Sequence, residues 1–114
     1  MAINVAYLYN REIVRPGGTI VVTAACCEGA GIHFLDGFGM RRGARYTQEL
    51  FGDRQLILFS PNLSDYDLSR LFPAGTRLCR NGAALVQMLR QRHPGRVHVS
   101  VFPWASQQLP FLAD

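Results

Sequence analysis

The sequence predicts a single small α/β domain with a mainly parallel sheet, arranged as a three-layer sandwich of the Rossmann or flavodoxin type. Three apolar segments rich in β-branched residues predict the main strands, over 19–25, 55–60 and 96–102. Segments of helix length separate them, and this alternation is typical of parallel sheets built from β-α-β units. The 114 residues are enough for one such domain.

Capping residues and apolar spacing predict the helices in the first half of the chain. Asn4 can cap a first helix, which Pro16 and the two glycines after it end. Glycines interrupt the stretch that follows the first strand, so the next helix is expected only over 44–51. A short further strand is expected over 76–79.

The second half contains two better-marked helices. Ser64, with Asp67 three residues later, predicts a capping box, and the inner face of that helix should carry Leu68, Leu71 and Phe72. Asn81 is the expected N-cap of the last helix, which should end at 93–95, His-Pro-Gly. Three apolar residues at helical spacing are expected to be buried in it: Leu85, Met88 and Leu89.

The charged residues narrow the classes of function. The net charge is +4, and every basic residue is an arginine, so no side chain can serve as an amine nucleophile or form a Schiff base. The arginines are scattered apart from Arg41, Arg42 and Arg45, and no aromatic residues alternate with them. This pattern argues against nucleic-acid binding.

The sequence also indicates a compartment. No apolar run approaches the roughly 20 residues that span a bilayer, and residues 1–10 lack the features of a signal peptide. Three cysteines, two of them adjacent, do not suggest a disulfide framework. We therefore expect a cytoplasmic protein with no membrane partner. Whether it forms homo-oligomers stays open.

A glycine-rich loop after the first predicted strand is the candidate site, because open α/β sheets bind ligands at the carboxyl ends of their strands. Its candidate residues are Cys27, Glu28, Gly29, Gly31 and His33. The glycines permit close approach of the backbone to a ligand or a neighbouring domain. However, Phe34 stands where a dinucleotide-binding pattern requires a third glycine.

The titratable residues around this loop match no known catalytic or metal-binding pattern. Cys26 and Cys27 should alternate in direction, so we expect one to face the core and the other the loop. The three histidines lack metal-ligand spacing, and no metal site is expected in this chain. Arg41 and Arg42 are the cationic groups nearest to the loop in sequence, and they are candidates for facing an anionic substrate or a cofactor phosphate.

Several segments, taken in order, resemble the C-terminal domain of the nickel-dependent lactate racemase family. Residues 14–22, VRPGGTIVV, and 27–31, CEGAG, are similar to the opening of that domain. Residues 56–60 resemble its second strand and the serine of the following loop. The helix over 81–89 and the strand and tail over 99–110 resemble its last elements, so the similarity covers nearly the whole chain.

The resemblance implies a two-domain enzyme that racemises or epimerises a small anionic 2-hydroxy acid. In that family a lysine of the N-terminal domain carries a nickel pincer nucleotide, and histidines of the same domain bind the nickel and move protons. The second domain closes the cleft and contributes a glutamine and a lysine before the Pro-Gly-Gly turn. Residues 4–14 contain neither. We therefore expect a C-terminal domain that needs its N-terminal partner domain, is not catalytic alone, and lines the cleft with residues 26–33.

Two other interpretations stay open. A helix that ends in Arg-Pro-Gly-Gly before an apolar strand also resembles the late region of class I S-adenosylmethionine methyltransferases, although no acidic Gly-x-Gly-x-Gly loop is present. The chain could instead be a stand-alone binding or assembly module. The interpretations differ in the coding sequence that they predict before Met1, so the gene sequence upstream of Met1 separates them.

Overall fold

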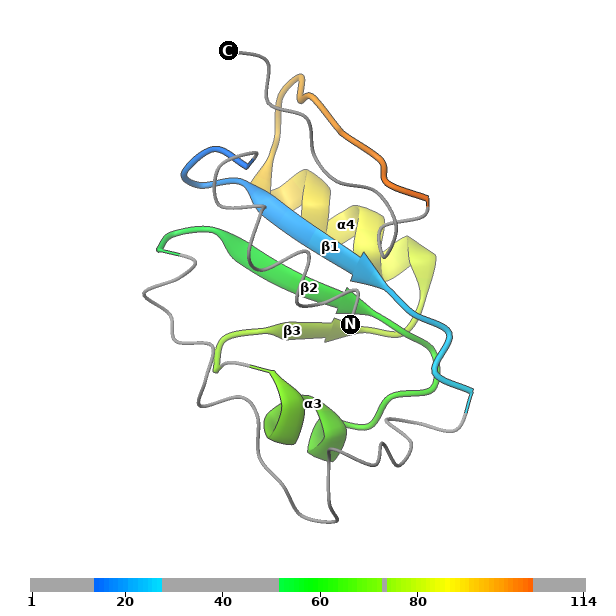
Figure 1. Ribbon diagram of the computed structural model, residues 1–114. Coiled ribbons are helices and arrows are strands. Elements are labelled where there is room, and N and C mark those ends of the chain that lie inside the picture. Colours follow the sequence, from blue (N-terminus) through cyan, green and yellow to red (C-terminus); the bar gives the residue numbers. More distant parts are fainter. Residues whose placement is uncertain (1–13, 28–51, 73, 104–114) are drawn as a thin grey trace.

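The three predicted features of an α/β domain, parallel strands, intervening helices and one sheet, are present in the structure (Figure 1). This computed structural model describes residues 14–27, 52–72 and 74–103. Its elements are β1 (Thr19–Thr23), β2 (Gln55–Phe59), α3 (Asp65–Leu71), β3 (Arg77–Cys79) and α4 (Gly82–Arg92). The strand order is β1-β2-β3, and both pairs are parallel. The helices predicted before residue 14 and over 44–51 lie outside the described residues.

A tight turn leads into β1. The backbone N–H of Gly18 donates to the carbonyl of Arg15 over 2.9 Å, with Pro16 and Gly17 as the central residues. Gly17 has a φ of 76°, a backbone conformation that residues with a side chain rarely adopt. This φ and the hydrogen bond from Gly18 to Arg15 fit a type II turn. The Gly17 N–H also donates to the carboxylate of Asp53 over 2.8 Å, so the turn is tied to the start of β2.

The central strand β2 carries the core of the domain. Leu56, Ile57 and Leu58 are 5%, 0% and 1% exposed, and successive side chains of a strand point to opposite faces. Both faces of β2 are therefore covered, as the continuous apolar run predicts. One face forms a cluster in which Leu56 and Leu58 pack with Ile20, Leu63 and Phe72.

Helix α3 begins at the predicted capping box. The backbone N–H of Asp67 donates to the Ser64 hydroxyl over 3.1 Å, and the Ser64 N–H donates to the Asp67 carboxylate over 3.2 Å. Both bonds satisfy N–H groups that a helix end leaves without partners. Leu68 then packs against the core cluster, and Phe72 at the C-cap is buried in it, so α3 is anchored on the Leu56–Leu58 face of the sheet.

Helix α4 lies behind β1 in the view of Figure 1. Asn81 caps it as predicted, because its side-chain oxygen accepts from the Ala84 N–H over 2.8 Å. At the other end, Nε2 of the C-cap residue His93 lies 2.8 Å from the Thr19 hydroxyl, and Arg92 donates to the backbone carbonyl of Asp53. These bonds fix the C-terminal end of α4 beside the first residues of β1 and β2.

The prediction of a strand after α4 is wrong. Residues 96–102 do not form a strand, and no backbone hydrogen bond joins residues 94–103 to another part of the described chain. Val97, Val99 and Val101 are 50%, 76% and 75% exposed. An alternating pattern favours a strand, but a strand exists only where its backbone groups pair with a neighbour, and here they do not.

The predicted burial in α4 is also wrong, and β1 differs in a smaller way. Leu85, Met88 and Leu89 are only half-buried, and α4 contains no buried residue. Helical spacing selects the face that can be buried, but another element must cover that face. Strand β1 ends at Thr23, two residues before the predicted end, and only Ile20 in it is buried.

Candidate functional site at the carboxyl ends of the strands

Because the three strands are parallel, the segments that leave their carboxyl ends meet at one edge of the sheet. We call this edge the carboxyl edge; it consists of residues 24–27 after β1, 60–62 after β2 and 80–81 after β3. Ligands of open parallel sheets bind at this edge. The sequence places its candidate loop here, and the structure adds the segments from β2 and β3.

The segment after β1 turns sharply at its cysteines. The Ala24 N–H still donates to the carbonyl of Phe59 over 3.1 Å, which continues the ladder by one residue. Cys26 then has a φ of 45°, in the left-handed region that side chains rarely adopt. Cys26 is half-buried and packs against the core cluster, whereas Cys27 is exposed. The prediction that the two cysteines face different surroundings is confirmed.

Hydrogen bonds join the three segments. The side-chain amide of Asn62 donates to the carbonyl of Ala25 over 2.6 Å, which ties the β2 segment to the β1 segment. The Ser60 N–H donates to the carbonyl of Cys79 over 2.9 Å, which ties it to the end of β3. The sequence analysis missed Asn62, although an asparagine directly after a strand and a proline is typical of a turn that bonds neighbouring backbone.

Ser60 is the most buried polar residue in the described part of the chain. Its side chain is fully buried, and its hydroxyl has no hydrogen-bond partner there. Ser60 directly follows the central strand, so its buried side chain lies at the middle of the carboxyl edge.

Arg80 supplies a positive charge at the carboxyl edge. Its Nε donates to the carbonyl of Leu63 over 3.1 Å, and its Nη2 lies 3.3 Å from the carboxylate of Asp65. Its side chain remains 46% exposed, so part of the guanidinium faces solvent. These contacts hold Arg80 close to Leu63, which directly follows Asn62. The sequence analysis assigned the cationic role to Arg41 and Arg42 and missed Arg80.

Of the predicted site residues, the structure describes only Cys27. The others lie outside the described residues: Glu28, Gly29, Gly31, His33, Arg41, Arg42 and Arg45. The structure describes two histidines, and neither belongs to the segments that form the carboxyl edge. His93 caps the C-terminal end of α4 at the opposite ends of the strands, and His98 lies in the exposed segment after α4.

The described residues do not form a metal centre or a membrane span. No group of three histidine, cysteine or acidic residues able to hold a metal occurs within residues 14–27, 52–72 and 74–103. Over the same ranges, no helix has both the length and the apolar character needed to cross a membrane. The carboxyl edge therefore offers hydrogen bonds and one guanidinium, without a described nucleophile–base pair.

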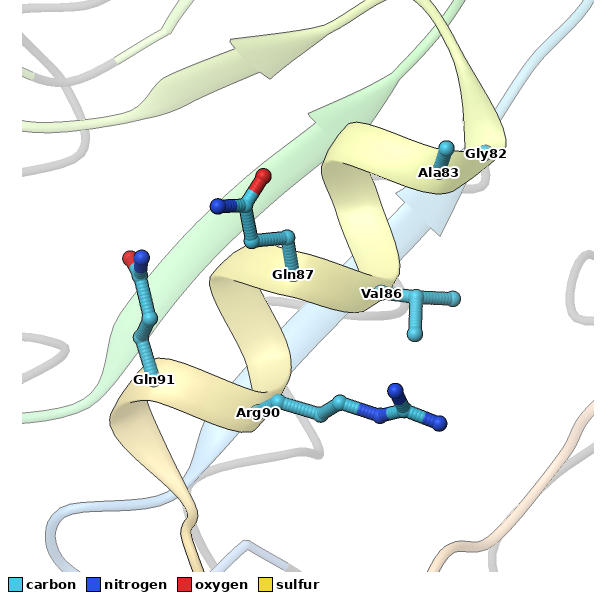
Figure 2. Close-up of a pocket in the computed structure, with 6 residues that line it drawn as sticks. All are labelled: Gly82, Ala83, Val86, Gln87, Arg90 and Gln91. Atoms are coloured by element: carbon cyan, nitrogen blue, oxygen red, sulfur yellow. The ribbon is translucent and has the colours of Figure 1, made fainter.

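A shallow hollow lies on the outer face of α4 (Figure 2). Gln87 and Gln91 point to one side of the helix, while Val86 and Arg90 point to another. Gly82 and Ala83 form the end of the hollow near the helix N-terminus. Its lining contains no acidic residue, histidine or thiol.

Comparisons of the chain with models of protein families, with curated proteins and with solved structures gave no match.

Proposed function

We propose that this chain is the C-terminal domain of a lactate racemase-like protein, in which its carboxyl edge forms one wall of a cleft for a small anionic 2-hydroxy acid. The observation that carries the proposal is the position of Arg80. A guanidinium held at the ligand-binding edge of a parallel sheet, next to the Asn62 turn, suits a carboxylate. The resemblance of the sequence to the racemase family supplies the substrate class.

The proposal includes a complete three-layer fold of the Rossmann or flavodoxin type. Two observations support it. Helix α3 packs on the sheet face that carries Leu56 and Leu58. The end of α4 bonds to Thr19, which pairs with Gln55 and so shares the opposite face with Ile57. Helices on opposite faces are the arrangement that parallel sheets of this class adopt.

The chain itself does not fit a nickel pincer nucleotide. It contains no lysine to which the nucleotide could be attached, and its described residues form no cluster of metal ligands. In the resembled family the group belongs to the N-terminal domain. We therefore assign the cofactor, the metal and the proton transfer to that partner domain.

The role left to this chain is to bind and orient. Arg80 would pair with the substrate carboxylate, and a charge-assisted bond of this kind is stronger than a neutral one. The side-chain oxygen of Asn62 can accept a hydrogen bond from a substrate hydroxyl, since its amide nitrogen already bonds Ala25. Orientation by such groups contributes to catalysis by holding the substrate in a reactive position.

The test is a nuclear magnetic resonance titration of the full chain. We expect lactate to shift the backbone signals of residues 24–27, 60–62 and 80–81, and propionate, which lacks the 2-hydroxyl, to shift them several-fold less. Arg80→Gln should abolish the shifts. Arg77→Gln, which changes an exposed arginine at the start of β3, should leave them intact and is the matched control.

Activity measurements complete the test. The chain alone should not interconvert lactate enantiomers, whereas adding a cofactor-loaded N-terminal racemase domain should allow turnover that Arg80→Gln reduces. Equal shifts with propionate, or shifts confined to other residues, would contradict the proposal. Saturable binding of S-adenosylmethionine at the same edge would favour the methyltransferase-like interpretation instead.

A further inference from the structure

The apolar segment after α4 is unusually exposed. Val97, Val99 and Val101 alternate with polar residues, and each is at least half exposed. No backbone hydrogen bond joins residues 94–103 to other described residues. Unpaired backbone beside alternating β-branched side chains is the feature by which an exposed segment adds a strand from another chain.

The charge around this segment has one sign. Residues 82–103 contain three arginines and two histidines but no acidic residue. Arg90 projects from α4 on the same side as the exposed Val86 (Figure 2). Arg96 opens the segment, which starts at the C-terminal end of α4 and lies on the β1 side of the sheet in Figure 1. We name these residues together the basic valine surface: Val86 and Arg90 on α4, and Arg96, Val97, Val99 and Val101 on the segment that follows α4.

We propose that the basic valine surface binds an extended, acidic segment of a partner protein in which carboxylates alternate with apolar side chains. The partner backbone pairs with residues 96–102, its apolar side chains pack on the valines, and its carboxylates face Arg90 and Arg96. Main-chain bonds supply affinity in this mode, and alternate side chains supply specificity. The inference rests on exposure and charge, independently of the proposed cleft.

Charge distinguishes this occupant from a second copy of the chain, and the shortage of aromatic side chains distinguishes it from a nucleic acid. A second copy of the chain would place its own Arg90 and Arg96 near the same residues, and like charges across an interface oppose binding. A single-stranded nucleic acid needs aromatic side chains on which its bases stack. Phe102 is the only aromatic residue between 82 and 103, and three exposed valines offer no such platform.

The experiment measures fluorescence anisotropy of a labelled peptide of alternating glutamate and valine with the full chain. The first control peptide has lysine in place of every glutamate, and the second has the same composition with its glutamates and valines in separate blocks. We expect only the alternating acidic peptide to bind. Raising the salt from about 0.05 to 0.5 M should weaken it about tenfold, because surface charges are screened.

Variants locate the site. The double substitution of Arg90→Glu and Arg96→Glu should weaken binding by about tenfold or more, and Val99→Asp should have a similar effect. Arg77→Glu is the matched charge control, and Val99→Thr keeps the branched shape. Both should bind nearly normally. Because Val99 is exposed, its variants should fold, which the amide spectrum of each variant checks.

Other results would overturn the proposal. Equal binding of the lysine or the blocked peptide would show that charge and alternation do not select the partner. Tighter binding of single-stranded DNA would replace the protein partner by a nucleic acid. A dimer in sedimentation that Val99→Asp dissociates would assign the surface to self-association. Absence of binding by the alternating acidic peptide would refute the proposed chemistry.

Discussion

The part of the domain built from β2, α3 and β3 buries its apolar side chains, whereas the part built from α4 and residues 94–103 leaves them half-buried or exposed. Ile57 and Leu58 are at most 1% exposed, but Val99 is 76% exposed, although all three lie in segments for which the sequence predicts a strand. The comparison teaches that a pattern selects the side chains that can be buried. A neighbouring element decides whether they are.

The difference has a local cause in each region. Helix α3 places Leu68 and Phe72 on the cluster around Leu58, so its amphipathic face has a partner. The side-chain hydrogen bonds that tie α4 to the start of β1 and to Asp53 lie at its C-terminal end, between His93 and Thr19 and from Arg92 to Asp53, and the apolar face along the helix is only half-buried. Hydrogen bonds at helix ends orient a helix but do not replace an apolar contact along its length.

Hydrogen exchange should reveal the largest contrast between the two regions. Amides of Leu56–Leu58 should exchange only through global unfolding, while those of Val97, Val99 and Val101 should exchange at nearly unprotected rates. The reason is that Leu56–Leu58 are bonded in a buried ladder, whereas the three valines are exposed and no backbone hydrogen bond joins them to other described residues. Exchange followed residue by residue by nuclear magnetic resonance measures this; comparable protection in both regions would contradict the comparison.

Truncation of one side chain in each region gives the next largest effect. Leu58→Ala should lower the free energy of unfolding by about 3 kcal/mol, since it leaves a cavity in the core cluster. Val99→Ala should change it by no more than about 0.5 kcal/mol, because this exposed side chain leaves no cavity. Urea unfolding of both variants provides the measurement. A loss of more than about 2 kcal/mol for Val99→Ala would show that residues 96–102 are part of the core.

Removal of the two helix caps should have the smallest effect of the three. Ser64→Ala should lower the free energy of global unfolding by about 1 kcal/mol, because α3 is packed into the core. Asn81→Ala removes an equivalent bond but should mainly promote fraying of α4, with a global loss below about 0.5 kcal/mol. Urea unfolding measures the global loss of stability. A loss of helix signal before the main unfolding transition reveals fraying of α4. Equal global losses would show that α4 unfolds together with the core.

Local chemistry in the sequence predicted much of the fold. The Pro-Gly-Gly turn, the two N-caps and the apolar run of β2 depend on neighbouring residues, and all are present. The strand over 96–102 and the buried face of α4 depend on what lies beside them, and both predictions are wrong.

The candidate site shows the same limit. That a loop follows β1 at the ligand-binding edge could be predicted from the parallel strands. The two cysteines differ in exposure as expected, but they lie in a turn after the end of β1 and not in the strand. Asn62 and Arg80 could not, because they reach the edge only when β2 and β3 align beside β1. Their partners, Ala25 for Asn62 and Leu63 for Arg80, lie 37 and 17 residues away.

The sequence by itself determined the turn before β1, the N-caps of α3 and α4 and the apolar run of β2, because caps, turns and hydrophobic runs act over a few residues. Only the tertiary structure decided that β2 is the central strand, that Arg80 and Asn62 share one edge, and that the valines after α4 remain at the surface. These outcomes depend on contacts between segments distant in the chain, whose energies no local pattern contains.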